Sequence, residues 1–304
     1  MEIVKLTPAI KSYIWGGKKL ISWGKKTSLD SISECWELSF NGDGPCLVGT
    51  GVDSGKELRS AVSKEDLGSN VTPFAFFPVL IKLIDSADNL SIQVHPSDAY
   101  ALKNEGQYGK TEMWYIIEAE PRAGLYVGFK RQTSAEEVRQ AIQDGSIVDL
   151  LNFHEVKPGQ SYFIASGTVH AIGKGVTLLE IQQNSTLTYR LYDYGRLDKT
   201  GHPRELHVEK ALKVLNYEPY NPPKFKAPVL GSSSYFTSSL GHSESSLRVK
   251  ASSKSFVCLT FVGEEEGTFA GISFKKGDTF FVPASKEGLI QGKASFVRTE
   301  VPER

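Results

Sequence analysis

The chain of 304 residues is long enough for two compact domains, and its 40% apolar composition is ordinary for a soluble protein with a core. Lys plus Arg and Asp plus Glu both total 35, so there is no net charge to attract nucleic acid or an acidic membrane, and we expect neither as a partner. The three cysteines form no C-x-x-C pair, and neither a leader pattern nor a membrane-length apolar run is visible, so we expect a cytoplasmic protein without a disulfide framework or a thiolate zinc site.

Most of the chain is predicted to form short β-strands separated by Gly, Pro, Asp and Ser. The predicted strands include residues 36–40, 81–84, 113–118, 124–129, 161–164 and 177–182. Many short strands with frequent turn residues are typical of β-barrels or sandwiches. The fold is therefore expected to be mainly β.

Helical signals are few, and we interpret them as insertions in the β framework. A short helix is predicted over 98–104. Another begins after Ser134, where Glu137 completes a capping box, and breaks near Gly145. A third is predicted over about 207–215, where four apolar residues share a face. These residues are Val208, Ala211, Leu212 and Leu215.

The string Asn221-Pro222-Pro223 suits neither a helix nor a central strand. We therefore place a domain boundary near residue 225, which gives a first domain over 1–225 and a second, all-β domain over 226–304.

An internal repeat supports this division. Val156–Ala165 and Phe274–Pro283 share the pattern apolar-Lys-x-Gly-polar-hydroxyl-aromatic-Phe, which we interpret as a turn followed by a strand. Aligning Gly159 with Gly277 places His170 opposite Gly288. If both halves are barrels, only the first is expected to hold a metal.

Four residues have the chemistry of metal ligands: Gln93, His95, Glu112 and His170. Gln93 and His95 are two apart, so on an extended strand both side chains leave the same face. Two imidazoles, a carboxylate and a neutral fourth ligand are typical of a catalytic divalent-metal centre, because a structural zinc site usually has four closed Cys or His ligands.

The strings around these residues resemble those of type I mannose-6-phosphate isomerases, particularly the short bacterial form, within the cupin superfamily. Four strings occur in the order and approximate spacing of that family: Ser91–Pro96, Gly109–Trp114, Gly167–Ala171 and Thr188–Asp193. Trp15-Gly16-Gly17 and Glu34–Glu37 also look like this family. The resemblance covers residues 5 to 217 well and implies two cupin-like jelly-roll barrels with a few inserted helices.

The resemblance also implies roles for individual residues. Gln93, His95, Glu112 and His170 would bind one Zn²⁺ per chain, and Arg190 would be the catalytic arginine. Glu180 and Lys110 are both candidates for the base, with Lys110 better suited to orient a sugar oxygen, and Trp15 is a weaker candidate for a substrate contact. Longer members have His-Lys-Pro-Glu where this chain has Gly109–Glu112, so a mechanism that uses that histidine as a proton carrier cannot apply here.

The expected activity is zinc-dependent interconversion of mannose 6-phosphate and fructose 6-phosphate by proton transfer between C1 and C2 through an enediolate. The expected partner is the sugar phosphate alone, with the chain as a monomer or weak homodimer. Two alternatives remain: a cupin oxygenase that uses Fe(II) or Mn(II), and a sugar-binding module without turnover. Arg190 favours the isomerase, because a passive binding site does not require it.

Overall fold

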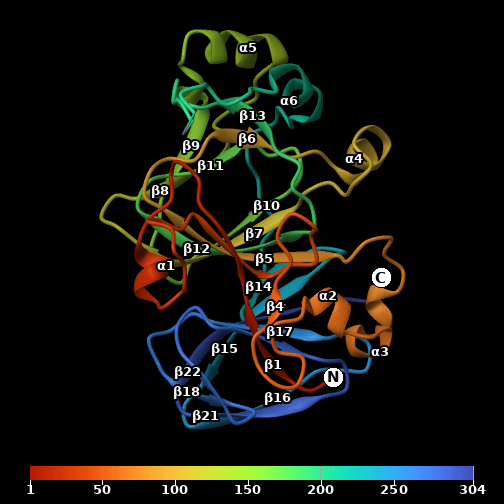
Figure 1. Ribbon diagram of the computed structural model, residues 1–304. Coiled ribbons are helices and arrows are strands. Elements are labelled where there is room, and N and C mark those ends of the chain that lie inside the picture. The colour runs from red at the N-terminus through yellow and green to blue at the C-terminus, as the bar shows by residue number, and fades with distance from the viewer. Residues whose placement is uncertain (199, 304) are drawn as a thin grey trace.

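The computed structural model describes residues 1–198 and 200–303 and is mainly β, as expected (Figure 1). Its strands form four antiparallel sheets that are arranged as two β units, one above the other in Figure 1. The N-terminus lies in the lower unit, and the C label stands close to α2 and α3.

The first β unit consists of a six-stranded and a five-stranded sheet. The six-stranded sheet has the order β10-β7-β12-β5-β3-β2 and the five-stranded sheet the order β13-β6-β11-β8-β9. The bounds are β2 (Ala9–Lys11), β3 (Glu34–Leu38), β5 (Val79–Ser86), β6 (Ile92–Val94), β7 (Glu112–Ala119), β8 (Gly124–Phe129), β9 (Leu151–Glu155), β10 (Ser161–Ile164), β11 (His170–Ile172), β12 (Val176–Gln183) and β13 (Tyr189–Tyr192). Apolar side chains from both sheets share one core, which includes Trp114 and Leu178 from one sheet and Leu125 and Val127 from the other.

The second β unit consists of a seven-stranded and a four-stranded sheet. Their orders are β14-β15-β22-β17-β20-β1-β4 and β16-β21-β18-β19. The bounds are β1 (Val4–Thr7), β4 (Leu47–Val48), β14 (Val229–Ser232), β15 (Thr237–Ser243), β16 (Ser246–Lys250), β17 (Val257–Phe261), β18 (Gly267–Phe269), β19 (Ile272–Phe274), β20 (Thr279–Val282), β21 (Glu287–Gln291) and β22 (Ala294–Glu300). Because β1 and β4 come from the first fifty residues, the start of the chain contributes to both units. The domain boundary near residue 225 falls in a segment between α6 and β14 without regular strands, and it stays a prediction.

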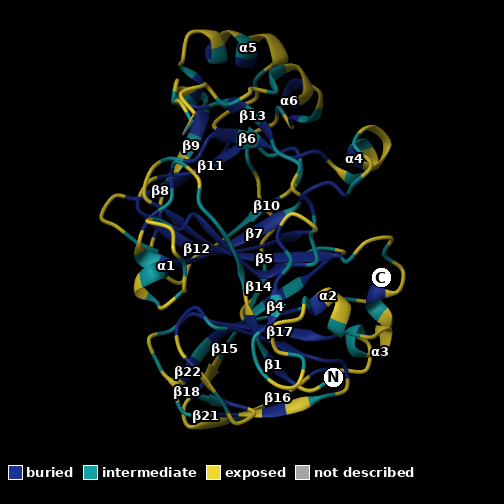
Figure 2. Ribbon diagram, viewed as in Figure 1, coloured by how far each residue is buried: buried dark blue, intermediate teal, exposed yellow. Residues whose placement is uncertain are grey.

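The central strands β5 and β12 of the six-stranded sheet are buried on both faces. All eight residues of β12 are buried, and so are all eight of β5 (Figure 2). Leu179 and Ile181 of β12 belong to the same core as Phe256 and Phe281 of the second β unit. Glu180 lies between them in sequence, and successive residues of a strand point to opposite faces, so it faces the interior of the first unit. The second unit therefore supports the sheet that carries the candidate site.

The three predicted helices are α4 (Asp98–Asn104), α5 (Ala135–Gln143) and α6 (Val208–Val214). Ser134 accepts a hydrogen bond from the backbone N–H of Glu137, which is the expected cap of α5. Figure 1 shows α5 and α6 at the end of the first unit, near β13 and β6. The short α1 (Lys19–Ser22), α2 (Leu58–Ala61), α3 (Lys64–Leu67), η1 (Ser69–Val71) and η2 (Ile147–Leu150) were not predicted. Among the described residues, no helix is long and apolar enough to cross a membrane.

The internal repeat has a structural counterpart. β20 lies 118 residues after β10, which is the same offset as between Gly159 and Gly277. Both glycines have positive φ, 88° and 84°, a conformation that favours glycine because it has no Cβ. The two β units thus use the same turn before the same strand.

Strand pairing extends this equivalence to the candidate ligands. Gln93 pairs with His170, and Val249 pairs with Gly288. Glu112 pairs with the last residue of β10, and Val257 pairs with the last residue of β20. The second unit therefore has buried apolar residues or glycine at the four positions, namely Val249, Ala251, Val257 and Gly288. A Cβ at Gly288 would lie 2.8 Å from Ile3 and from Phe269, so apolar side chains fill the place of a ligand there.

Candidate metal centre and adjoining pocket

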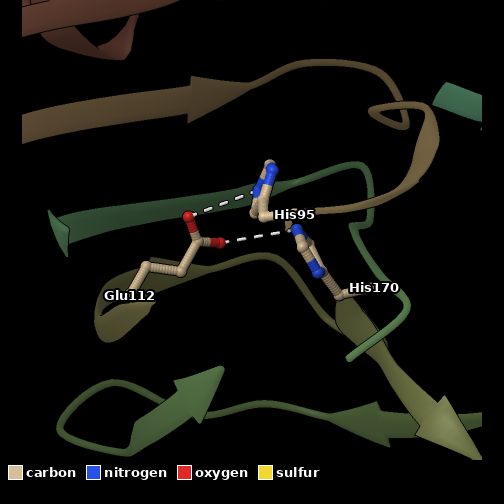
Figure 3. Close-up of side chains that lie close together, drawn as sticks. All are labelled: His95, Glu112 and His170. Atoms are coloured by element: carbon tan, nitrogen blue, oxygen red, sulfur yellow. Dashed lines mark ion pairs between the residues drawn. The ribbon is translucent and has the colours of Figure 1, made fainter. Parts of the chain in front are cut away.

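His95, Glu112 and His170 come together at one buried point (Figure 3). One ligand atom from each lies within 4.8 Å of the others. His95 Nε2 is 3.5 Å from Oε2 of Glu112, and His170 Nε2 is 3.4 Å from Oε1. Glu112 is the first residue of β7, His170 the first of β11, and His95 follows β6 directly. The cluster therefore forms where ends of three strands meet.

The backbone fixes the orientation of both imidazoles. His95 Nδ1 lies 2.7 Å from the carbonyl oxygen of Leu187, and His170 Nδ1 lies 2.9 Å from that of Thr168. A carbonyl oxygen only accepts, so each Nδ1 carries the hydrogen and each Nε2 presents a lone pair to Glu112. Burial lowers the pKa of His170 to about 4 and that of His95 well below its usual value, so both rings are neutral at neutral pH.

These three side chains fit a divalent cation. The Nε2 atoms of both imidazoles lie near the two buried oxygens of Glu112, and among the described residues Oε1 of this carboxylate has neither a hydrogen-bond donor nor a cation beside it. Burial, followed by the charge of Glu180, raises the pKa of Glu112 to about 7. Lys110 Nζ lies 2.6 Å from Oε2 and balances the negative charge of the carboxylate at that oxygen only. Neutral imidazole and carboxylate are common ligands of divalent metals, and an ion shared by all three would supply the positive charge that Oε1 of Glu112 lacks.

Gln93 lies beside the cluster. Its Nε2 is 3.3 Å from Nε2 of His170, and Ser91 Oγ donates to its Oε1 over 3.4 Å. The amide oxygen is the atom of Gln93 that can bind a metal, and a half-turn of the amide would exchange the positions of nitrogen and oxygen. The expected fourth candidate is thus adjacent, with its nitrogen toward His170.

A row of alternating charges crosses the interior face of the six-stranded sheet. Lys110 lies between Glu112 and Glu180, with Nζ 3.7 Å from Oε1 of Glu180. Lys82 Nζ lies 3.4 Å from carboxylate oxygens of both Glu180 and Glu34. Although burial raises the pKa of Glu180, the ammonium groups of Lys110 and Lys82 hold it below its usual value. Glu180 is therefore ionised at neutral pH.

A cavity of about 380 Å³ opens beside this row and has a size suited to a small ligand. Its lining includes all of the sequence-predicted residues outside the buried triad. These residues are Gln93, Lys110, Glu180, Arg190 and Trp15. A larger hollow, of about 480 Å³, lies beside Pro222 and Pro223, but Glu218 is the only charged residue of its lining. Of these two cavities, the smaller one therefore has the charged side chains that could bind and convert a ligand.

Arg190 reaches this cavity from β13. Its guanidinium donates from one terminal nitrogen to the carbonyl oxygen of Glu205 over 2.7 Å, while Nε is buried without a hydrogen-bond partner. The nearby Asp193 forms ion pairs with Arg196 and Arg204 and not with Arg190. Within residues 1–198 and 200–303, no carboxylate lies within ion-pair distance of Arg190, so its charge is available to a ligand.

Several lining residues were not singled out from the sequence. Lys11, Asp43 and Arg204 contribute to the same cavity. Arg204 is held by two bonds to the carboxylate of Asp193, of 2.7 and 2.5 Å. They lie in segments far apart in the sequence, and none has a motif spacing to another site residue, so no sequence signal brought them together.

Comparison with known proteins agrees with the resemblance found in the sequence. A profile of the family "Phosphomannose isomerase type I, catalytic domain" matches residues 3–112. A putative mannose-6-phosphate isomerase of Bacillus subtilis is 43% identical over 211 residues, which span 69% of this chain and 66% of the relative. The mannose-6-phosphate isomerase of Streptococcus mutans is 36% identical over 283 residues, 89% of each chain.

Solved structures are similar over nearly the whole length. The mannose 6-phosphate isomerase of Bacillus subtilis has a TM-score of 0.86 and 33% identity, with 98% of this chain and 99% of that chain covered. A putative mannosephosphate isomerase of Archaeoglobus fulgidus has a TM-score of 0.81 and 25% identity, with 98% and 96% covered. Together with the identity to the Streptococcus mutans enzyme over 89% of both chains, this shows that the chain belongs to the type I phosphomannose isomerase family.

Proposed function

We propose that this protein is a zinc-dependent isomerase that interconverts mannose 6-phosphate and fructose 6-phosphate. The observation that carries the proposal is the convergence of His95, Glu112 and His170 beside Gln93 and Lys110, which line a cavity that Arg190 also lines. The relatives named above as mannose-6-phosphate isomerases support the choice of substrate.

His95, Glu112 and His170 would hold the zinc ion, and Gln93 would supply a fourth ligand through its amide oxygen. A bound zinc ion stabilises the negative charge that an enediolate spreads over O1 and O2. Arg190 is charged at neutral pH and has no carboxylate partner among the described residues, so it would add a fixed positive charge to the same oxygens. We propose that the apolar second β unit holds no metal.

Glu180 is our candidate for the base that moves the proton between C1 and C2. It is ionised, it lines the cavity, and Lys110 contacts both it and Glu112. Trp114 Nε1 donates to its other oxygen over 3.0 Å and fixes the carboxylate. The neighbouring ammonium groups weaken it as a base, so turnover is expected to be sensitive to Lys82 and Lys110 as well. Lys110 would donate to a sugar oxygen, and Trp15 would form part of the wall.

The function is tested by a coupled assay of fructose 6-phosphate formation, with and without a chelator, on protein purified without added metal. We expect about one zinc ion per chain and loss of turnover after chelation, restored by zinc. Turnover that is insensitive to complete metal removal would contradict the zinc role. Iron in the purified protein, with oxygen uptake, would favour the oxygenase.

The base is tested by Glu180→Gln, which keeps the shape of the side chain and removes its charge. Turnover and exchange of the C1 and C2 protons with solvent should both fall by about 10²- to 10⁴-fold, the usual contribution of a positioned base. Lys110→Met should lower turnover but leave more exchange than Glu180→Gln. Wild-type exchange rates in a zinc-loaded Glu180→Gln protein would show that another group moves the proton.

A further inference from the structure

We propose that Asp98 is a positioning residue that holds the segment Gly109–Glu112, and with it a metal ligand, in place, and that Tyr235 ties this residue to the second β unit. The inference rests on the proposed function of the site. Asp98 neither lines the cavity nor belongs to the His-Glu-His cluster, so any effect on zinc must pass through the residues that it holds.

Asp98 joins three separate parts of the chain. It is the first residue of α4, three residues after His95. Its Oδ1 accepts hydrogen bonds from the backbone N–H of Gly109, at 2.9 Å, and from Nε2 of Gln183, at 2.8 Å. Its Oδ2 accepts from the hydroxyl of Tyr235, at 2.6 Å. Hydrogen bonds to a charged acceptor are stronger than neutral ones, so this carboxylate is a firm anchor.

Gln183 completes the hold on the segment. Its side-chain Oε1 accepts from the backbone N–H of Thr111 at 2.7 Å, and the backbone N–H of Gln183 donates to the carbonyl oxygen of Thr111 at 3.0 Å. The backbone N–H of Lys110, which lies between Gly109 and Thr111, donates to the carbonyl oxygen of Pro96 at 3.0 Å. Every backbone N–H from Gly109 to Thr111 is thus bonded, and the segment directly precedes Glu112.

The residue types of this segment suit the arrangement. A Cβ at Gly109 would lie 2.5 Å from the carbonyl oxygen of Pro96 and 2.6 Å from the backbone nitrogen of Asp98, so no side chain fits there. Thr111 has the backbone N–H that Gln183 requires, which a proline would lack. The His-Lys-Pro-Glu string expected in longer relatives could therefore form neither contact in this way.

Tyr235 brings the second β unit to this point. It is 4% exposed and lies just before β15, and its ring packs on Tyr108 at 5.2 Å between centroids. Tyr108 is the residue before Gly109, and its carbonyl oxygen accepts from the hydroxyl of Ser185. The second unit lacks polar side chains at the four positions equivalent to the candidate ligands. Through Tyr235, however, it holds the segment that carries Lys110 and Glu112. Residues outside the ligand shell commonly affect metal affinity in this way.

The test compares Asp98→Ala with Asp98→Asn, using zinc alone as the probe. Zinc affinity is measured by competition with a chromophoric chelator, and kcat and KM are measured on the zinc-loaded proteins. Asp98→Ala should bind zinc about 10- to 100-fold more weakly, the usual range for such a contact, and should lower kcat more than it changes KM. Asp98→Asn keeps an acceptor oxygen for Gly109 and Gln183 and should recover most of both losses.

Tyr235→Phe removes a single hydroxyl and should weaken zinc binding by a smaller factor than Asp98→Ala. Tyr217→Phe is the matched control, because its hydroxyl donates to the carbonyl oxygen of Leu212 and should leave zinc affinity unchanged. Asp144→Ala is the control for loss of a carboxylate that bonds Ser146 at the end of α5.

Unchanged zinc affinity in a folded Asp98→Ala protein would overturn the inference, and so would an equal loss in Asp98→Asn. If Asp98→Ala does not fold, Tyr235→Phe decides, since wild-type zinc affinity in that variant would overturn the tie to the second unit. A wild-type protein that does not convert mannose 6-phosphate would overturn the proposed function, whereas the zinc comparison would still test Asp98.

Discussion

Replacement of His170 by alanine is expected to abolish metal retention and with it turnover. Nε2 of His170 faces the Oε1 side of Glu112, and Lys110 lies on the other side, beside Oε2. The variant would leave only His95 and Glu112 of the three clustered ligand residues, so zinc should be lost on dialysis. Loss of the main electrophile should lower the rate by at least about 10³-fold, because even one electrostatic donor typically contributes 10²- to 10³-fold.

Metal content by atomic emission and fructose 6-phosphate formation would measure both effects. His242→Ala is the matched control. His242 is an exposed residue of the second β unit, outside the His-Glu-His cluster, and its ring lies 3.3 Å from the hydroxyl of Ser295. A His170→Ala protein that keeps stoichiometric zinc and normal turnover would remove His170 from the centre. Loss of zinc without loss of turnover would instead separate the metal from the chemistry.

Local sequence signals predicted local structure well. The predicted ranges 98–104, 124–129 and 161–164 coincide with α4, β8 and β10. In each case the determining information lies within the segment or at its ends, in turn residues, capping residues and the period of the apolar side chains. The other predicted strands have shifted ends, by up to two residues, because strand ends depend on pairing partners that a local pattern does not contain.

Long-range pairing could not be predicted in the same way. β1 pairs with β20, so Val4 lies opposite Phe281, and nothing in either segment identifies the other. The same limit applies to the cavity, because Lys11 and Arg204 both line it although almost the whole first unit separates them in the sequence. Gln93 and His95 were recognisable because a two-residue spacing on a strand is itself geometric information.

The internal repeat falls between these cases. Its glycine turn was visible in the sequence, and the structure has both glycines at nearly the same φ. The equivalence of Glu112 with Val257 was not visible, because it depends on which residue of β10 or β20 each one pairs with. Sequence alone therefore suggested that one ligand is missing from the second unit, while pairing shows that all four positions are apolar or glycine.

Arg190→Ala is expected to lower turnover by about 10²- to 10³-fold while zinc stays bound, because a fixed positive charge near a developing enediolate contributes on that scale. Arg190 is not part of the His-Glu-His cluster, so its removal should not affect metal content. Within the described part of the chain, the one hydrogen bond from the guanidinium is to the carbonyl oxygen of Glu205, and it holds the group without neutralising it. Arg131→Ala is the matched control, since Arg131 is an exposed arginine paired with Glu137 and should change neither zinc nor turnover.

The kinetic parameters distinguish two ways in which Arg190 could act. If it stabilises the enediolate, kcat and kcat/KM should fall together, because the contact strengthens only in the transition state. If it holds the phosphate, KM should rise with little change in kcat, since that contact is the same in the bound substrate and the transition state. Arg190→Lys should recover little in the first case, because an ammonium group on a flexible stem does not reproduce the planar guanidinium held by Glu205. Near-normal turnover of a zinc-loaded Arg190→Ala protein would contradict both.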